Sequence, residues 1–265
     1  MTLNEISAKL SDAGISNAMQ ESLWIIGHAL KVSSAEIFSR DEFAPDEARK
    51  IDALISRRMN HEPLQYILGE ADFYGRDFAV GNGVLIPRHD TETLIDGVKS
   101  IFATDEDFRF LDWGTGSGCI AVTIMLEFPN SRGVMLDVSD YAMSFARKNL
   151  RRYGLDERAE FSVTGNFDLI ISNPPYIPSC EIDGLMRDVR DFEPHIALDG
   201  GIDGMTFYRK IFHLAFNTLR HGGYIILETG NFQQVKEIET CGGFQAVGKI
   251  FDTGNFPRCI ILRRV

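Results

Sequence analysis

The sequence predicts an α/β protein with a doubly wound, mainly parallel sheet of seven strands, a small N-terminal helical domain and a connecting β-hairpin. From Phe108 onward, short apolar runs alternate with helical stretches, which is the pattern of a sheet covered on both faces. The preceding third has helical periodicity, and a glycine-rich segment of period two separates the regions. We therefore expect a helical domain over residues 1–70, a hairpin over 71–87 and an α/β domain over 88–265.

The N-terminal third contains three helical patterns. Apolar residues recur at spacings of three and four along residues 3–10 and 19–30. Pro45, followed by Asp46 and Glu47, marks the beginning of a third helix, because the N–H that proline lacks is unpaired in a first turn anyway. These helices could form a small bundle.

The remaining elements follow from short apolar runs. Residues 72–87 alternate in period two between glycines and form the expected hairpin. The strands expected in the α/β domain are Arg109–Asp112, Gly133–Asp137, Ala159–Val163, Asp168–Ser172, Gly223–Glu228, Gln245–Phe251 and Arg258–Arg263. The last two have no helix between them, so we expect them to be antiparallel neighbours.

Charge and composition exclude several classes of protein. The 265 residues are 44% hydrophobic and carry 27 basic and 38 acidic side chains, a net charge of -11. Residues 1–90 carry 9 Lys/Arg against 14 Asp/Glu, and the rest 18 against 24, so no basic domain is present and direct nucleic-acid binding is not expected. The largest cationic cluster, Arg147, Lys148, Arg151 and Arg152, is interpreted as a solvated helix face.

The sequence has no sign of a membrane segment, a secretion signal or a metal site. No run approaches the ~20 apolar residues that a spanning helix needs, and the N-terminus lacks an apolar signal region. Cys119, Cys180, Cys241 and Cys259 are far apart and have no histidine at metal-ligand spacing, so we expect buried or free thiols. A cytoplasmic protein is expected.

A glycine-rich turn follows the first expected strand of the α/β domain. It reads D-W-G-T-G-S-G and leads into a helix from Cys119. Glycines let a ligand approach the backbone, and a helix N-terminus offers unpaired N–H groups. The candidate cofactor-binding residues are Asp112, Gly114, Thr115, Gly116, Ser117 and Gly118. The spacing differs from the G-x-G-x-x-G of pyrophosphate binders, so a tight turn without a ligand is the alternative.

Asp137 ends the next expected strand, about twenty residues beyond the glycines. A carboxylate at this place can accept hydrogen bonds from both hydroxyls of a ribose. Its alternative role is to cap the following helix, but Ser139 and Asp140 are available for that. We therefore expect Asp137 to bind a ribose without a 2′-phosphate.

The tetrapeptide Asn173-Pro174-Pro175-Tyr176 directly follows the strand expected over residues 168–172. The prolines remove two N–H donors and restrict the backbone, so the Asn173 side chain and the Pro174 carbonyl form a stiff group of acceptors. An NH₂ group donates two hydrogen bonds and fits such acceptors, and Tyr176 can stack on it. A proline-rich turn with a polar cap is the alternative, but parallel sheets bind ligands at this end of their strands.

Together these motifs resemble those of class I methyltransferases that use S-adenosylmethionine, in the amino-methylating branch with Asn-Pro-Pro-Tyr. The chain is similar to the HemK/PrmC group, which methylates the side-chain amide of the glutamine in the Gly-Gly-Gln motif of peptide chain release factors. The likeness covers nearly the whole sequence. Its further supports are Glu62–Gly69, Phe73–Gly75, Leu85–Arg88, Glu193-Pro194, Ala197-Leu198, Gly200–Gly204 and Leu227–Gly230.

The resemblance implies a Rossmann-like fold, S-adenosylmethionine as cofactor and a release factor as protein partner, held in part by the N-terminal domain. It implies that residues 112–118 line the methionine and ribose part of the cofactor site and that Asp137 binds the ribose. Asn173 and the Pro174 carbonyl would bind the substrate amide, with Tyr176 packing on it. The residues expected around the same pocket are Pro175, Pro87 and Arg88, with Asn173 also close to the cofactor.

The chain departs from the family pattern at two places. His89-Asp90 stand where the family has Pro-Glu or Pro-Asp, and His89 is interpreted as a surface substitution. The family also has a loop of about ten residues between the third and fourth strands, part of which contacts adenine; here residues 163–167 lead almost directly into the next strand. The adenine contacts are therefore unassigned, with Asn166 as the candidate replacement.

Positioning of the amide is the expected catalytic device, since none of the six histidines lies in a recognisable base motif. Two alternatives stay open at this point. One is the same chemistry on a ribosomal-protein glutamine or a nucleic-acid adenine. The other is a non-catalytic protein that binds the cofactor or a partner. A monomer is expected.

Overall fold

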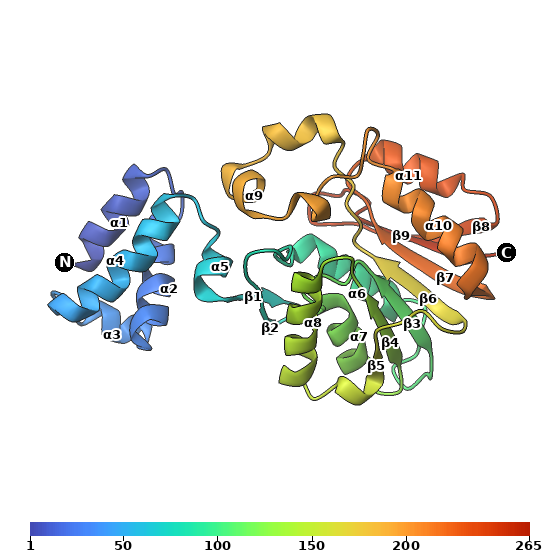
Figure 1. Ribbon diagram of the computed structural model, residues 1–265, viewed down its shortest axis with the longest axis horizontal. Helices are drawn as coiled ribbons and strands as arrows, with labels where there is room; N and C mark the ends of the chain where they lie inside the picture. Colours follow the sequence, from blue (N-terminus) through green and yellow to red (C-terminus); the bar gives the residue numbers. More distant parts are fainter. The chain divides into compact units, whose positions relative to one another are not determined.

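The computed structural model describes all residues, 1–265, and divides into two compact units (Figure 1). The first comprises Met1–Glu70 and Met186–Phe192, and the second comprises Ala71–Leu185 and Glu193–Val265. The first unit therefore includes a short segment, with helix α9 (Arg187–Phe192), that the sequence assigns to the α/β domain.

The N-terminal part of the first unit is helical, as predicted. Its helices are α1 (Leu3–Asp12), α2 (Ala18–Leu30), α3 (Ser34–Phe38), α4 (Pro45–Met59) and α5 (Leu64–Leu68). Thr2 caps α1 by accepting a hydrogen bond from the Glu5 N–H at 3.2 Å, while the Glu5 carboxylate accepts one from the Thr2 N–H at 2.9 Å. Pro45 is the first residue of α4. The apolar faces of these helices form one core.

The second unit is built on a seven-stranded sheet, as predicted. Its strands are β3 (Arg109–Trp113), β4 (Arg132–Leu136), β5 (Ala159–Glu160), β6 (Phe167–Ser172), β7 (Leu219–Glu228), β8 (Phe244–Ile250) and β9 (Cys259–Arg264). They lie in the order β5-β4-β3-β6-β7-β9-β8. The first five are parallel, whereas β9 runs antiparallel to both β7 and β8. Strand β5 is shorter than expected and pairs with β4 through two residues only.

Helices cover both faces of this sheet (Figure 1). One apolar core includes residues of α6 (Glu92–Lys99), α7 (Cys119–Glu127) and α8 (Asp140–Arg152). The other includes residues of α10 (Thr206–Thr218) and α11 (Phe232–Glu239). Short 3₁₀ helices, η1 (His89–Thr91), η2 (Asp156–Arg158), η3 (Ser179–Gly184) and η4 (His195–Ala197), lie in the connections. Strands buried on both faces explain the continuous apolar runs in the sequence.

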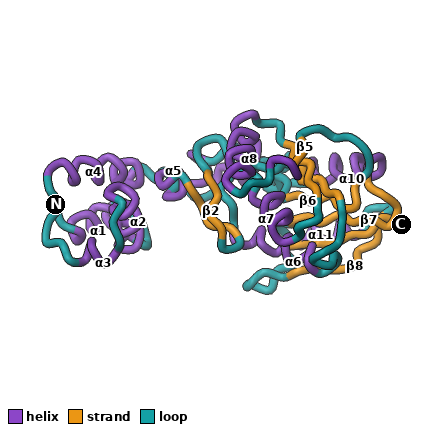
Figure 2. The backbone as a smooth tube through the Cα atoms, turned by 90° about the horizontal axis from the view of Figure 1, so that it is seen from below, coloured by secondary structure: helices purple, strands orange, loops and turns teal.

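The hairpin is shorter than predicted. Strands β1 (Glu70–Phe73) and β2 (Arg76–Ala79) form a separate two-stranded sheet (Figure 2), and no strand extends from residue 80 to residue 87. Tyr74 and Gly75 form its turn, both with positive φ. Phe73 and Phe78 are fully buried in the core shared with α6 and α7, so the hairpin is an integral part of the second unit.

No helix combines the length and apolar character needed to cross a membrane. All four cysteines are free thiols, of which Cys119 and Cys259 are buried.

Candidate active site

The candidate residues gather at one edge of the sheet. Because β3, β4, β6 and β7 are parallel neighbours, their carboxyl ends meet there. The glycine turn follows β3, Asp137 follows β4, Asn173 follows β6, and Glu228 ends β7. The Ser172 hydroxyl donates a hydrogen bond to the Trp113 carbonyl at 2.6 Å, which joins the last residues of β6 and β3, just before Asn173 and Gly114.

The glycine turn requires glycine at three positions. Gly114, Gly116 and Gly118 have φ of 74°, 57° and 82°, a region that other residues rarely adopt. A Cβ on Gly118 would also lie 2.8 Å from the Met135 Cε atom, so this glycine allows α7 to begin close to β4. In contrast, a Cβ on Gly114 would meet no atom within 4 Å, which leaves the backbone open to a ligand on that side.

The polar side chains of the turn are buried and stabilise its backbone conformation. Asp112 is fully buried, and its Oδ2 atom accepts a hydrogen bond of 2.6 Å from the Thr115 hydroxyl. Burial raises the pKa of Asp112 to about 7, against the lowering effect of Thr115. Thr115 and Ser117 are also buried. Without rearrangement, only the backbone of these residues is available to a ligand.

The buried Asn149 side chain of α8 is a part of this support that sequence reasoning missed. Its Oδ1 atom accepts from the Ala79 N–H at 2.8 Å, and its Nδ2 group donates to the carbonyls of Ala79 and Ser117 at 3.0 and 2.8 Å. The amide thereby joins the hairpin to the glycine turn. A single asparagine within a helix carries no pattern that could have indicated this.

Asp137 is joined to the turn. Its Oδ2 atom accepts a hydrogen bond from the Gly116 N–H at 2.9 Å, and its Oδ1 atom accepts one from the Ser139 N–H at 2.9 Å. Ser139 caps α8 by accepting from the Ala142 N–H at 3.3 Å, so the capping role belongs to serine. Each carboxylate oxygen of Asp137 keeps a lone pair for a further donor.

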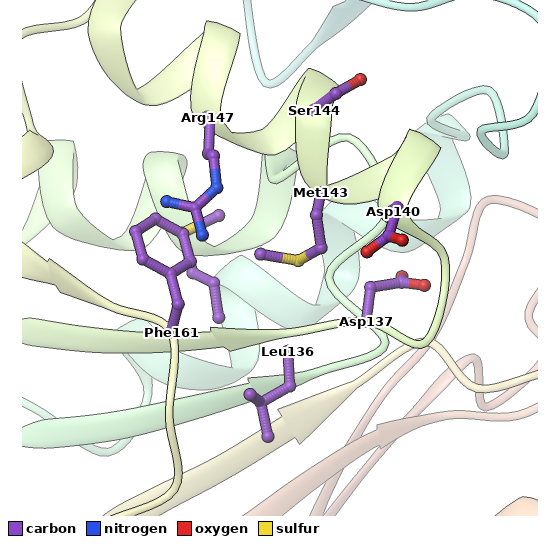
Figure 3. A pocket seen from close by; sticks show the side chains of 8 residues that line it. Leu136, Asp137, Asp140, Met143, Ser144, Arg147 and Phe161 are labelled. Atoms are coloured by element: carbon purple, nitrogen blue, oxygen red, sulfur yellow. The ribbon is translucent and has the colours of Figure 1, made fainter.

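A cavity of about 340 Å³ opens beside Asp137. It is lined by Met135, Leu136, Asp137, Asp140, Met143, Ser144, Arg147 and Phe161 (Figure 3). The Arg147 guanidinium lies 3.6 Å from the centre of the Phe161 ring, in a cation–π contact. Arg147 is exposed, as expected for a solvated helix face, but its side chain also lines this cavity. Asn166, the candidate for the adenine contact, is not among the lining residues.

The Asn173 side chain is fixed by a residue that the sequence did not indicate. Its Nδ2 group donates a hydrogen bond of 3.1 Å to the hydroxyl of Thr91, the last residue of η1. The Oδ1 atom is left as a free acceptor. Since Pro174 and Pro175 have no N–H, the start of the tetrapeptide presents acceptors and no competing backbone donor.

Hydrogen bonds and close packing fix the position of Tyr176. Its hydroxyl donates to the Glu228 Oε1 atom at 3.2 Å, and its carbonyl accepts from the Gln234 Nε2 group at 2.8 Å. A Cβ on Gly230 would lie 2.4 Å from the tyrosine ring. Burial, followed by the nearby Glu228 carboxyl, raises the pKa of Tyr176 well above its usual range, so the hydroxyl remains a donor.

Arg88 is engaged in an ion pair at the segment that leads to Thr91. Its guanidinium contacts the Glu193 carboxylate, which is buried and also accepts a hydrogen bond of 3.3 Å from the Ile86 N–H. Pro87 lies between these two anchored residues. The His89 side chain is 80% exposed, in agreement with its interpretation as a surface substitution.

Comparisons with known proteins agree on one family. The PrmC N-terminal domain model matches residues 2–69, and the methyltransferase small domain model matches residues 91–185, from η1 to the segment after the tetrapeptide. A release factor glutamine methyltransferase of Geobacter sulfurreducens is 39% identical over 229 residues, 83% of this chain and 80% of the relative. One of Moorella thermoacetica is 34% identical over 276 residues, 99% of this chain and 97% of the relative.

The chain belongs to the release factor glutamine methyltransferase family. Among solved structures, a methyltransferase of Pyrococcus furiosus has a TM-score of 0.54 and 20% identity, and the match covers 82% of this chain and 98% of that one. This likeness confirms the predicted Rossmann-like methyltransferase fold. The family membership agrees with the resemblance drawn from the glycine turn and the Asn-Pro-Pro-Tyr tetrapeptide.

Proposed function

We propose that this protein transfers a methyl group from S-adenosylmethionine to the side-chain amide nitrogen of the glutamine in the Gly-Gly-Gln motif of a peptide chain release factor, and so supports translation termination. The observation that carries the proposal is the anchoring of Asn173. Thr91 holds its NH₂ group and leaves its carbonyl oxygen as an acceptor, directly after β6, the strand beside the one that leads into the glycine turn.

The cofactor site fits S-adenosylmethionine in three respects. The backbone at Gly114 is open to a ligand, and the Asp137 carboxylate can accept hydrogen bonds from ribose hydroxyls. A cavity lies beside Asp137. When bound, the cofactor supplies a methyl group activated by a sulfonium. In this proposal, backbone groups of residues 114–118 contact it, while Asp112, Thr115 and Ser117 keep the turn in shape.

We assign the adenine to the cavity beside Asp137. Phe161 and Arg147 both line it, and the guanidinium is stacked over one face of the ring, so that either planar group is available to stack on a base. Only residues 161–166 join β5 to β6, so in this proposal these two side chains contact the adenine in place of a longer loop.

The chemical step relies on placing the amide. An amide nitrogen is a poor nucleophile because its lone pair is delocalised into the carbonyl. Asn173 Oδ1 and the Pro174 carbonyl accept the two N–H bonds, orient the nitrogen and favour the positive charge that develops on it. Tyr176 packs on the planar group, and Pro175, Pro87 and Arg88 shape its surroundings. No side chain is assigned as a base, since the alkylated nitrogen is acidic and can release its proton to water.

The function is tested with methyl-labelled S-adenosylmethionine and a purified release factor. Label is expected in the wild-type factor and not in a factor whose Gly-Gly-Gln glutamine is replaced by alanine. Parallel incubations with ribosomal proteins and with adenine-containing RNA and DNA address the other acceptors. Label that persists in the factor without the Gly-Gly-Gln glutamine would contradict the proposal, and so would label that appears only in a parallel incubation.

The Phe161→Ala protein is expected to bind S-adenosylmethionine roughly tenfold more weakly, because stacking on a base is worth about 1–3 kcal/mol. Calorimetric titration measures the change. Phe216→Ala is the matched control, since Phe216 is a half-exposed aromatic residue near the end of α10, at the opposite edge of the sheet. Equal affinities of the Phe161→Ala and wild-type proteins would mean that the adenine lies elsewhere.

A further inference from the structure

Glu228 is a buried carboxyl to which the proposed reaction assigns no role. It is the last residue of β7 and is 1% exposed. The preceding residue, Leu227, is paired in register with Ser172, so Glu228 lies beside the start of the tetrapeptide. Burial of a carboxyl costs free energy unless hydrogen bonds or nearby charges stabilise it. The groups around Glu228 therefore decide what it does.

Of the two polar side chains of the tetrapeptide, one is bonded to this carboxyl and the other to its neighbour Thr91. The Tyr176 hydroxyl donates to Glu228 Oε1 directly, at 3.2 Å. Asn173 is bonded to a neighbour of Glu228: the Thr91 oxygen accepts from Asn173 Nδ2 at 3.1 Å, and the Thr91 side chain is one of the groups that lower the pKa of Glu228.

The surroundings of Glu228 contain charges of both signs. The groups that face it are Thr91 and Asp90 of η1, Arg258 and Cys259 at the start of β9, Tyr208 of α10, and Tyr176. Arg258 is shared, at 3.2 Å from Asp90 and 3.0 Å from Asp252. The Glu228 Oε2 atom has no hydrogen-bond partner. Burial raises the pKa of Glu228 to about 7, although Thr91, Arg258 and Tyr176 oppose this rise.

We propose that Glu228 is a positioning residue that orients Asn173 and Tyr176 for methyl transfer. The inference rests on the proposed function and concerns the same site. The ionised carboxylate accepts from the Tyr176 hydroxyl and is stabilised by the nearby Thr91 side chain, whose oxygen holds the Asn173 NH₂ group. A protonated Glu228 is a weaker acceptor for the Tyr176 hydroxyl and no longer attracts the Thr91 hydroxyl as a carboxylate does, so that both tetrapeptide side chains are held less firmly.

A set of threonine variants isolates this network. Thr91→Val keeps the shape of the side chain and removes the hydroxyl, and kcat is expected to fall at least about tenfold, with unchanged S-adenosylmethionine affinity. Thr91→Ser restores the hydroxyl and is expected to recover most of the loss. Thr123→Val is the matched control, because Thr123 is equally buried in α7 but its hydroxyl has no partner.

Glu228→Gln gives a second, independent readout. In the wild-type protein, kcat is expected to rise with pH through an apparent pKa near 7, as Glu228 loses its proton. The Glu228→Gln protein is expected to have a kcat at least about tenfold lower and to lack this rise, because it cannot ionise. Calorimetry with S-adenosylmethionine and thermal unfolding show whether the fold and the cofactor site are intact.

The outcomes separate this inference from the proposed function. Wild-type kcat in both Thr91→Val and Glu228→Gln would overturn it, and so would an unaltered pH profile in Glu228→Gln. If Glu228→Gln does not fold, the contrast between Thr91→Val and Thr91→Ser decides, and equal kcat values would overturn the inference. Absence of methyl transfer by the wild-type protein contradicts the proposed function instead.

Discussion

The Asn173→Ala protein is expected to bind S-adenosylmethionine as tightly as the wild-type protein and to lose at least about a hundredfold in kcat. Alanine removes the Oδ1 acceptor that orients the substrate nitrogen and stabilises the charge developing on it. The loss is expected mainly in kcat, because a free amide can still enter the site but adopts many orientations there. Single-turnover transfer of labelled methyl to a release factor measures it.

The matched control is the same substitution at Asn217. Asn217 lies near the end of α10, at the opposite edge of the sheet, and donates a hydrogen bond of 2.9 Å to the His213 carbonyl. Its removal should leave transfer unchanged. Wild-type kcat in the Asn173→Ala protein would show that the tetrapeptide does not position the amide.

The Asp137→Ala protein is expected to bind S-adenosylmethionine at least about tenfold more weakly, since hydrogen bonds to a charged carboxylate are worth about 1.5–3 kcal/mol. Two causes act together. The ribose loses its acceptor, and the Gly116 N–H loses the partner that holds the glycine turn. Because both effects precede chemistry, saturating cofactor should restore much of kcat.

Calorimetry on Asp137→Ala, Asp137→Asn and Asp105→Ala makes the test specific. Asp137→Asn keeps one acceptor oxygen and should give an intermediate affinity. Asp105 is exposed in the segment before β3, at the opposite edge of the sheet, so its removal controls for lost charge. An affinity equal to the wild-type value in Asp137→Ala would remove the ribose assignment.

The sequence predicted the elements of the site but not their supports. The glycine turn, Asp137 and the tetrapeptide could be recognised because each follows a strand of a parallel sheet, and the carboxyl ends of such strands converge. Thr91, Asn149 and Glu193 could not, because a buried polar group is defined by its partners. Asn149 contacts a hairpin residue 70 positions away, and Glu193 contacts Arg88 105 positions away.

The cavity beside Asp137 could not be predicted from the sequence for a similar reason. The short segment after β5 indicated a missing loop and suggested Asn166 in its place. The helical spacing correctly predicted that Arg147 lies on an exposed helix face, but it gave no sign that this side chain lines a cavity. Only the packing of α8 against the segment after β5 brings the Arg147 guanidinium to the Phe161 ring.

The sequence by itself determined the fold class, the number and order of the strands along the chain, and the residue types that the chemistry needs. These follow from periodicity, glycine and proline, which act over a few residues. The tertiary structure alone decided where β1 and β2 end, that Thr91 holds the Asn173 side chain, and that Tyr176 is bonded to the buried Glu228. Such features depend on distances and burial between segments far apart in the chain, and no local pattern encodes them.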